Sequence, residues 1–507
     1  MTKKEILLAS ISGLLMPLAF PNFNLSFIAW IGLVPLITAV FKSSPAKGLL
    51  LSTITGTIFH LGLVYWVTVS MTSYGKLPLA VSILVLILFA FVLSIFISIP
   101  ICLSCYVKKH LNFSFLLTLP LFWTASEYIK SWFLTGFPWE NLGYSQFNVL
   151  PVIQIADITG VYGITFIIVF ANCTLSCLLN SLTTDKKIPY RELSALILLI
   201  VITLLYGQNR LNSIDENQGS PIKISLVQPN IPQDVKWDPQ YLTKTLEKLE
   251  YLSLISAPDK PDIVIWPESA TPFFFQADEM HRKTVEKIVK KINAYLLLGS
   301  PSWEKTSGNP QFFNSAFLIS PENNIKGKYN KIHLVPYGEY IPFKKLFPFI
   351  DKMVEGIGDF ASGSTVKNLS IPSSPFAAII CYEIIFPDLV RRFVKEGAGF
   401  IVNITNDAWF GATSAPYQHL SMCSFRAVEN RRYVARAANT GISAFISPDG
   451  QIFKQTKIFT DDSLTAMIHK RTDKTFYSLY GDIFAFICTF LSLLFIYMAR
   501  RKKAKNT

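Results

Sequence analysis

Hydrophobic runs long enough to cross a membrane fill the first 209 residues of the chain. A bilayer core about 30 Å thick needs about 20 helical residues to cross it. Residues 210–475 have the mixed composition of a soluble domain, and one more apolar run follows near the end. The pattern predicts eight membrane spans. They fall near residues 5–21, 24–41, 48–70, 78–106, 112–130, 160–181, 193–208 and 482–499.

Composition supports this division. Hydrophobic residues make up 50% of the 507 residues and charged residues only 16%, whereas a soluble globular chain has roughly 25% charged residues. These values exclude a disordered chain and a small disulfide-stapled domain, and they argue against an ordinary cytosolic enzyme. We expect an integral membrane protein with a soluble domain at 210–475, a last span at 482–499 and a basic tail at 500–507.

Lysine and arginine fall on alternate connections between the predicted spans, and this sets the orientation. The other short connections offer Lys76 and the border residue Lys130. By the positive-inside rule, the basic connections and both termini lie in the cytoplasm, so the soluble domain, which follows seven spans, lies outside. The basic connections carry Lys3, Lys4, Lys42, Lys47, Lys108, Lys109, Lys186, Lys187, Arg191, Arg500, Arg501, Lys502, Lys503 and Lys505.

The net charge of +13 does not indicate a nucleic-acid partner. Residues 210–475 contain 31 lysines and arginines against 27 aspartates and glutamates. The remaining excess of positive charge lies in the membrane part and its flanks, where it determines the membrane topology. We therefore expect membrane lipid as a partner and no nucleic acid.

The soluble domain alternates between apolar strand patterns and helical patterns, which is typical of a layered α/β or α+β domain. Predicted strands are 222–228, 262–266, 294–299, 314–319, 376–381, 399–405 and 442–447. Predicted helices are 241–255, 279–293, 387–396 and 416–437. Along the last of these helices, Arg431, Arg432 and Arg436 are expected to form a solvated or sheet-capping stripe.

Chemically capable residues follow the apolar strands directly, where α/β sheets gather ligands and catalytic groups. Glu268 follows DIVIW, Cys381 follows FAAII, and Lys331 lies in a loop-like segment between them. A thiol needs a base or a lowered pKa to become a nucleophile. Glu268 suits the base and Lys331 the cation that stabilises an oxyanion, together with the backbone N–H after Cys381. Because Cys423 is the other cysteine of an oxidising compartment, a Cys381–Cys423 disulfide stays open as an alternative.

The stretches IWPESA, YNKIHLVPYGEYIPF and IICYEIIFP resemble the nitrilase, or carbon–nitrogen hydrolase, superfamily with its Glu–Lys–Cys triad. Two more stretches, GFPWENLGYSQ at 136–146 and VQPNIPQDVKWD at 227–238, extend the resemblance to one family, the apolipoprotein N-acyltransferases. The resemblance implies an αββα sandwich for the soluble domain, beside about eight transmembrane helices. It also implies supporting roles for Glu339, Tyr382, Glu383 and Trp237, the last at the substrate entrance.

The same resemblance implies a two-step acyl transfer in the inner membrane, with the catalytic domain on the periplasmic side. The acyl donor would be a phospholipid, often phosphatidylethanolamine, and the acceptor the α-amine of an S-diacylglyceryl cysteine of an apolipoprotein. We expect no metal and no other cofactor.

Two other classes of function stay open. One is a membrane-tethered amidase that hydrolyses a small amide with the same triad, and the other is a transporter or receptor with a decayed nitrilase domain. The GFPWENLGYSQ stretch and two apolar, glycine-containing loops at 340–362 and 408–416 favour the acyltransferase. We expect these loops to act as a lid that dips into lipid.

Overall fold

The computed structural model describes residues 1–184, 187–215, 218–305, 310–342 and 359–506, and it divides into two compact units. The first unit comprises Met1–Thr68, Pro78–Ser213 and Tyr480–Thr507. The second comprises Val69–Leu77 and Ile214–Leu479.

The first unit is helical, and four of its described helices are long and apolar enough to cross a membrane. A fifth candidate is a bent pair, in which α3 (Pro45–Leu63) continues as Val67–Tyr74 after a bend of 60°. The four helices are α5 (Leu79–Leu111), α9 (Val161–Thr183), α10 (Tyr190–Ser213) and α16 (Ile483–Asn506).

Three of the eight predicted spans fold as shorter or interrupted helices. In the first, α1 (Lys3–Leu15) ends where Pro17 enters a 3₁₀ turn. The second is a 3₁₀ turn at Ser26–Trp30 followed by α2 (Val34–Val40), and the fifth is α6 (Phe115–Lys130). Proline cannot continue a regular hydrogen-bonded helix, which accounts for the first interruption. By length and composition, the described helices therefore supply four or five spans rather than eight.

Small residues allow close helix packing in this unit. A Cβ atom added to Gly56 of α3 would lie 2.7 Å from the Cβ of Ser94 of α5. Small residues at such crossings let helix backbones approach in the way typical of membrane proteins.

The described residues of the second unit form two six-stranded sheets. In the first, β1, β2 and β3 are parallel neighbours, and the remaining strands join antiparallel. Its order is β12 (Asp462–His469), β1 (Pro221–Gln228), β2 (Ile263–Ile265), β3 (Tyr295–Glu304), β4 (Gln311–Ile319) and β5 (Ile325–Asn330).

The second sheet has the same plan, with β7, β8 and β9 as parallel neighbours. Its order is β11 (Ile452–Gln455), β10 (Ala444–Ile446), β9 (Val434–Ala438), β8 (Ile401–Thr405), β7 (Ser374–Ile380) and β6 (Leu369–Ile371).

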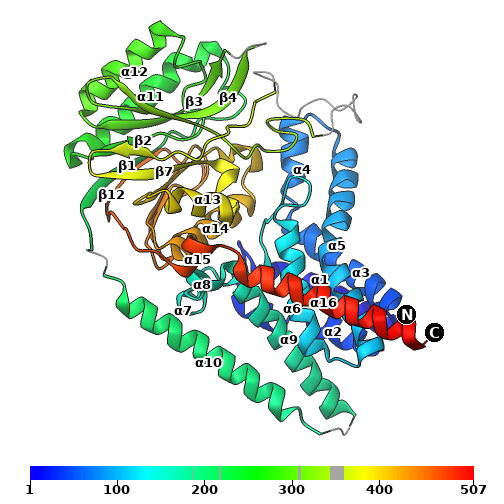
Figure 1. Ribbon diagram of the computed structural model, residues 1–507. Coiled ribbons are helices and arrows are strands. Elements are labelled where there is room, and N and C mark those ends of the chain that lie inside the picture. Colours follow the sequence, from blue (N-terminus) through cyan, green and yellow to red (C-terminus); the bar gives the residue numbers. More distant parts are fainter. Residues whose placement is uncertain (185–186, 216–217, 306–309, 343–358, 507) are drawn as a thin grey trace. The chain divides into compact units, whose positions relative to one another are not determined.

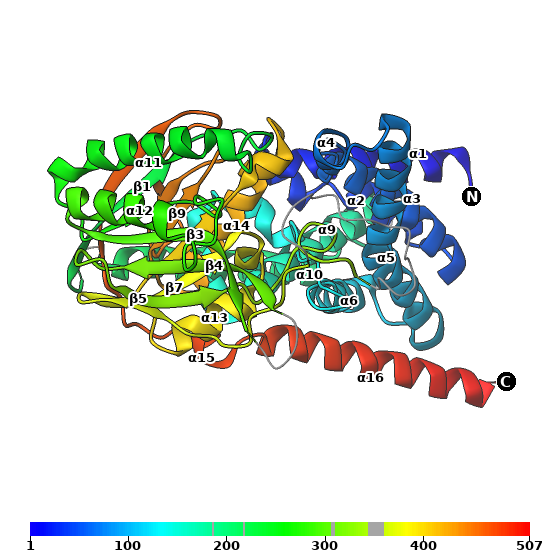
Figure 2. The same ribbon diagram turned by 90° about the horizontal axis from the view of Figure 1, so that it is seen from above.

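Helices cover the outer face of each sheet, so the unit is an αββα sandwich (Figures 1 and 2). The first sheet carries α11 (Leu242–Ser256) and α12 (Glu279–Ile292), and the second carries α13 (Pro387–Lys395) and α14 (Ala415–Asn430). Because both faces of the central strands are buried, those strands read as continuous apolar runs, such as Ile263–Ile265. The predicted layered α/β fold is thus confirmed.

The predicted helix over 416–437 is wrong in its last seven residues. The helix ends at Asn430, Arg431 adopts a left-handed conformation with φ +49°, and Val434–Ala438 form strand β9. Of the two alternatives predicted for these arginines, the solvated stripe is wrong as well, because Arg431, Arg432 and Arg436 are all buried. Buried partners compensate for the lost hydration: Arg432 Nε donates to the Ala398 carbonyl at 2.7 Å, for example.

The segment Val69–Leu77 lies between two helices of the first unit in the sequence but packs within the second unit. Its Ser70 hydroxyl donates to the carbonyl of Trp409 at 2.7 Å, and the Tyr74 hydroxyl donates to that of Ala408 at 3.0 Å. The Tyr74 and Trp409 rings meet edge to face at 5.0 Å. This segment therefore fixes the loop that begins after β8.

The α3–α5 contact gives a direct test of packing. Gly56→Leu places a side chain where only a hydrogen fits, so we expect a loss of about 1–3 kcal/mol of stability. Thermal unfolding of the detergent-solubilised protein measures this effect. Ala46→Leu adds comparable bulk at an exposed position of the same helix and serves as the control. Equal melting temperatures for the two variants would contradict the close crossing.

Candidate active site

Glu268 is the third residue after β2, a central strand of the first sheet, and both of its carboxylate oxygens accept hydrogen bonds. Asn314 Nδ2 donates to Oε1 at 2.7 Å, and the backbone N–H of Asn406 donates to Oε2 at 2.9 Å. The residue is only 6% exposed. A carboxylate whose two oxygens both accept hydrogen bonds keeps one orientation relative to the neighbouring side chains.

Lys331 is the first residue after β5 and is 1% exposed. Its ammonium lies 3.5 Å from Glu268 Oε1 and 2.9 Å from Glu339 Oε2. Burial alone would lower the pKa of Lys331, but Glu339 and Glu268 outweigh it and raise that pKa above its ordinary value. The side chain therefore stays protonated and can stabilise a developing negative charge.

Cys381 follows β7 directly and has φ +53°, in the left-handed region. This turn takes the residue out of the strand and into a 3₁₀ turn, Cys381–Ile385. Burial raises the pKa of the thiol and nearby Glu268 raises it further, against the opposing effect of Lys331. The resting side chain is therefore a protonated thiol that needs a base to react. The structure thus brings together the three residues that the sequence singled out.

The predicted alternative of a disulfide is wrong for this structure, because Cys381 and Cys423 are both free. Cys423 is fully buried, and its sulfur lies 3.8 Å from Arg436 Nη1.

Glu339 shares its partners with Glu268. Asn314 Nδ2 donates to Glu339 Oε1 at 2.7 Å, and the backbone N–H of Val335 donates to Oε2 at 2.8 Å. The buried carboxylate of Glu268 and the partly buried carboxylate of Glu339 therefore share one ammonium and one amide as partners. The sequence did not predict Asn314, whose only signal was its place at the start of the apolar run NSAFLI.

Glu383 connects the chain around Lys331 to the chain around Cys381. Its Oε1 accepts from the backbone N–H groups of Ile332 at 2.7 Å and His333 at 3.1 Å, and its Oε2 accepts from the N–H of Ile380 at 2.8 Å. The Tyr329 hydroxyl donates a further bond at 2.7 Å. Through these hydrogen bonds, Glu383 links the chain at the end of β5 to the chain at the end of β7.

Tyr382 and Trp237 have different surroundings. Tyr382 is buried in an aromatic cluster, with its ring 5.2 Å from Phe386 and 5.9 Å from His333. Trp237 is partly exposed and lines an open, mostly apolar cavity of about 400 Å³. The other lining residues are Pro272, Phe273, Phe274, Ala277 and Asp278.

Lys236 is a second buried lysine at the site, and the sequence reasoning missed it. It is 3% exposed, and its Nζ donates to the backbone carbonyl of Glu268 at 3.0 Å. Burial lowers the pKa of Lys236 to about 8, opposed by the charges of Glu268 and Cys381. The available signal was its position beside Trp237 in the stretch VQPNIPQDVKWD.

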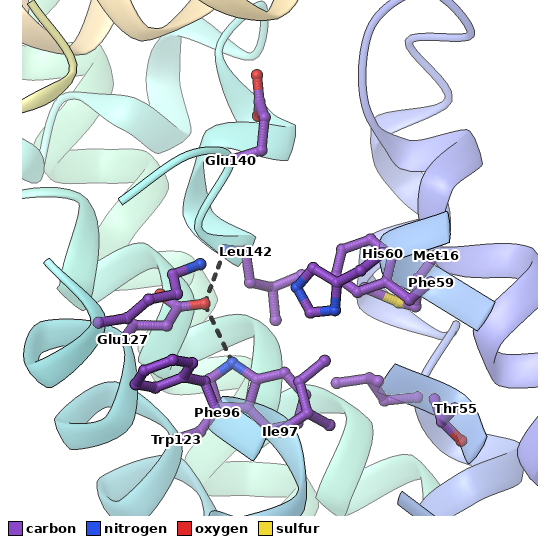
Figure 3. Close-up of a pocket in the computed structure, with 12 residues that line it drawn as sticks. Met16, Thr55, Phe59, His60, Phe96, Ile97, Trp123, Glu127, Glu140 and Leu142 are labelled. Carbon is purple, nitrogen blue, oxygen red and sulfur yellow. Dashed lines mark hydrogen bonds between the residues drawn. The ribbon is translucent and has the colours of Figure 1, made fainter. Parts of the chain in front are cut away.

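The GFPWENLGYSQ stretch belongs to the first unit, where Glu127 of α6 anchors it (Figure 3). Glu127 Oε1 accepts from the backbone N–H of Leu142 at 2.8 Å and from Trp123 Nε1 at 3.1 Å. The Thr165 hydroxyl donates to Oε2 at 2.7 Å. The adjoining cavity of about 20 Å³ is large enough for one water molecule but not for an acyl chain.

Most of the predicted lid loop 340–362 lies outside the described residues. In the loop at 408–416, Trp409, Phe410 and Gly411 are partly exposed, and Trp409 packs on Tyr74. A lid function for these loops stays a prediction.

The pKa of Glu383 predicts a pH-dependent stability. Burial raises this pKa from 4.5 to about 7. A carboxyl with a raised pKa stabilises the fold fully below about pH 4.5 and loses that contribution as the pH rises through 7. We expect the difference in unfolding free energy between wild type and Glu383→Gln to shift by roughly 3 kcal/mol across this window. Denaturant titration at several pH values measures it, and a pH-independent difference would contradict the assignment.

Comparison with known proteins follows the division into two units. A family model described as Apolipoprotein N-acyltransferase N-terminal domain matches residues 12–174, and one described as Carbon-nitrogen hydrolase matches residues 223–475. Among solved structures, Nit3 of Saccharomyces cerevisiae, described as a member of branch 10 of the nitrilase superfamily, is 16% identical. It covers 49% of this chain and 90% of its own, with a TM-score of 0.39.

Two curated relatives match nearly the whole chain. The Apolipoprotein N-acyltransferase of Geobacter metallireducens is 40% identical over 507 residues, which cover 99% of this chain and 96% of that protein. The protein of the same name from Haemophilus influenzae is 32% identical over 497 residues, which cover 97% and 93% respectively. With both family models matched in order and relatives similar from end to end, the chain belongs to the apolipoprotein N-acyltransferase family.

Proposed function

We propose that this protein transfers an acyl chain from a phospholipid, through a thioester on Cys381, to the N-terminal amine of the S-diacylglyceryl cysteine of apolipoproteins. The observation that carries the proposal is the buried cluster of Glu268, Lys331 and Cys381. It occurs in a chain whose relatives, named as N-acyltransferases, match it over nearly its full length.

In the first step, Glu268 takes the proton of the Cys381 thiol, and the thiolate attacks the sn-1 ester carbonyl of the phospholipid. Lys331 and the backbone N–H of Tyr382 stabilise the oxyanion that forms. The tetrahedral intermediate then breaks the ester C–O bond, and Glu268 returns its proton to the departing oxygen. The products are an acyl-enzyme and a lysophospholipid.

In the second step, the neutral α-amine of the acceptor attacks the thioester carbonyl. The same cation and N–H group stabilise the second oxyanion. Collapse breaks the C–S bond, and the amine proton returns through Glu268 to the departing thiolate. The new amide bond leaves the enzyme ready for another phospholipid, so the two substrates react in turn.

The remaining predicted residues fit supporting roles. Glu339, 2.9 Å from Lys331, balances its charge and keeps the ammonium in place. Glu383 braces the strand ends that carry Lys331 and Cys381. The apolar cavity beside Trp237 suits an acyl chain at the substrate entrance.

The membrane assignment extends the same proposal. We propose seven spans within residues 1–209, a catalytic domain at 210–475, a last span at 482–499 and a cytoplasmic tail at 500–507. The shorter helices α1, α2 and α6 would complete the count of eight in the inner membrane. The alternating basic connections support cytoplasmic termini and a periplasmic catalytic domain. Phosphatidylethanolamine is the proposed donor.

Mass spectrometry of the intact protein tests the covalent step. Wild-type protein incubated with phosphatidylethanolamine vesicles should gain the mass of one acyl chain, because the thioester accumulates when no acceptor is present. Cys381→Ser should gain none and should abolish acylation of a diacylglyceryl peptide. The control is Cys423→Ser, which should still form the acyl-enzyme. Active wild-type protein without an acyl adduct would reject the thioester mechanism.

The nature of the acceptor separates the transferase from the alternative amidase. A diacylglyceryl peptide with a free N-terminal amine should discharge the acyl-enzyme, whereas the same peptide with an acetylated amine should not. Hydrolysis of small amides, without transfer to the lipidated peptide, would favour the membrane-tethered amidase instead.

A further inference from the structure

We propose that the hydroxyl of Thr405 hydrogen-bonds the sulfur of Cys381 in both of its charge states, with Asp407 and Arg436 orienting that hydroxyl. The inference goes beyond the proposed function and takes from it only that Cys381 is the nucleophile. Thr405 would be a catalytic residue because it touches the reacting sulfur.

The sheet register places Thr405 beside Cys381. Strands β7 and β8 are parallel neighbours, with Ile380 opposite Ile404. Thr405 is the last residue of β8, and Cys381 is the first residue after β7. Thr405 is fully buried, and an interaction of its hydroxyl with the Cys381 side chain acts to lower the pKa of the thiol. The same hydroxyl donates to Asp407 Oδ1 at 3.0 Å.

Asp407 is a buried carboxylate that the proposed reaction does not use. Its Oδ2 accepts from Arg436 Nη2 at 2.7 Å, and its Oδ1 lies 3.0 Å from His419 Nδ1. Burial would raise the pKa of Asp407, but Arg436 and His419 outweigh it and hold that pKa at about 2. Asp407 is therefore ionised at physiological pH and always able to accept a hydrogen bond from Thr405.

A hydroxyl has one proton to donate and two lone pairs to accept with. While Cys381 is a thiol, the Thr405 proton points to Asp407 and the Thr405 oxygen accepts the S–H. When Glu268 removes the thiol proton, the Thr405 hydroxyl rotates and donates to the thiolate. Asp407 then keeps its interactions with Arg436 and His419 only. No covalent bond forms or breaks at Thr405, and the hydrogen bond to the charged sulfur is the stronger of the two.

The same buried cluster also holds the backbone of the nucleophile. Asn403 Nδ2 donates to the Cys381 carbonyl at 3.3 Å, and Arg436 Nη1 binds Asn403 Oδ1. Arg436 thus acts as a positioning residue in two ways. Through Asn403 it holds the backbone carbonyl of Cys381, and through Asp407 it orients the hydroxyl of Thr405.

Several charged or titratable groups act on Cys381 from the surrounding elements, so the test isolates the hydroxyl. These groups are Glu268, Lys331, Lys236, Asp407, Arg436 and His419. Thr405→Val removes the hydroxyl while keeping the side-chain shape and every one of these charges. Thr405→Ser keeps the hydroxyl and is the matched control.

The experiment measures alkylation of Cys381 by iodoacetamide in the full-length, detergent-solubilised protein, with peptide mapping, over a range of pH. We expect Thr405→Val to react roughly 10-fold to 100-fold more slowly at neutral pH, with its profile displaced to higher pH. Thr405→Ser should follow the wild type. Thr405→Ala serves as a second hydroxyl-free variant should the valine protein fail to fold.

Identical pH profiles for wild type and the hydroxyl-free variants would overturn the proposal. Equal slowing of the valine and serine variants would also overturn it, since that result reports packing rather than the hydroxyl. The assay uses no lipid, so it is independent of the proposed function. That function fails separately if wild-type protein forms no acyl-enzyme with phosphatidylethanolamine vesicles.

Discussion

The buried ammonium of Lys331 is the charge on which the site depends. It lies 3.5 Å from Glu268 and 2.9 Å from Glu339, and it is 1% exposed. Two carboxylates removed from water would repel each other strongly, and breaking such a cluster by removing one partner is costly. The positive charge of Lys331 offsets this repulsion, and the neutral side-chain amide of Asn314 donates hydrogen bonds to both carboxylates. In the proposed mechanism, the fixed Glu268 is the base that deprotonates the buried Cys381 thiol.

The sandwich explains why these groups meet. Glu268 and Lys331 follow strands of one sheet, and Cys381 follows a strand of the other. Only face-to-face packing of the two sheets brings the three strand ends together. Glu383 then ties the chain after Lys331 to the chain before Cys381 with three backbone hydrogen bonds. The scaffold thus places an electrostatic cluster in a water-poor region, where such interactions are strong.

Much of this arrangement was predictable from local patterns. Apolar runs such as DIVIW and FAAII predicted strands, and the polar residues after them predicted the site. The burial of Arg436 was not predictable, because an arginine in VARAA looks solvent-facing until Asp407, distant in sequence, is known to lie against it. Asn314 and Lys236 were missed for the same reason, since their partners are set by tertiary contacts. The eight predicted spans exceed the four or five helices of the described residues that are long and apolar enough to cross a membrane, because prolines and charges shorten the others.

The rate of acyl-enzyme formation in the Glu268→Gln protein tests the central claim, that this carboxylate activates the buried thiol. Mixed rapidly with phospholipid vesicles and followed by peptide mapping at Cys381, the variant should acylate at least about 100-fold more slowly than wild type, because glutamine cannot take the proton. Acylation at the wild-type rate, with Cys381 as the modified residue, would contradict the account.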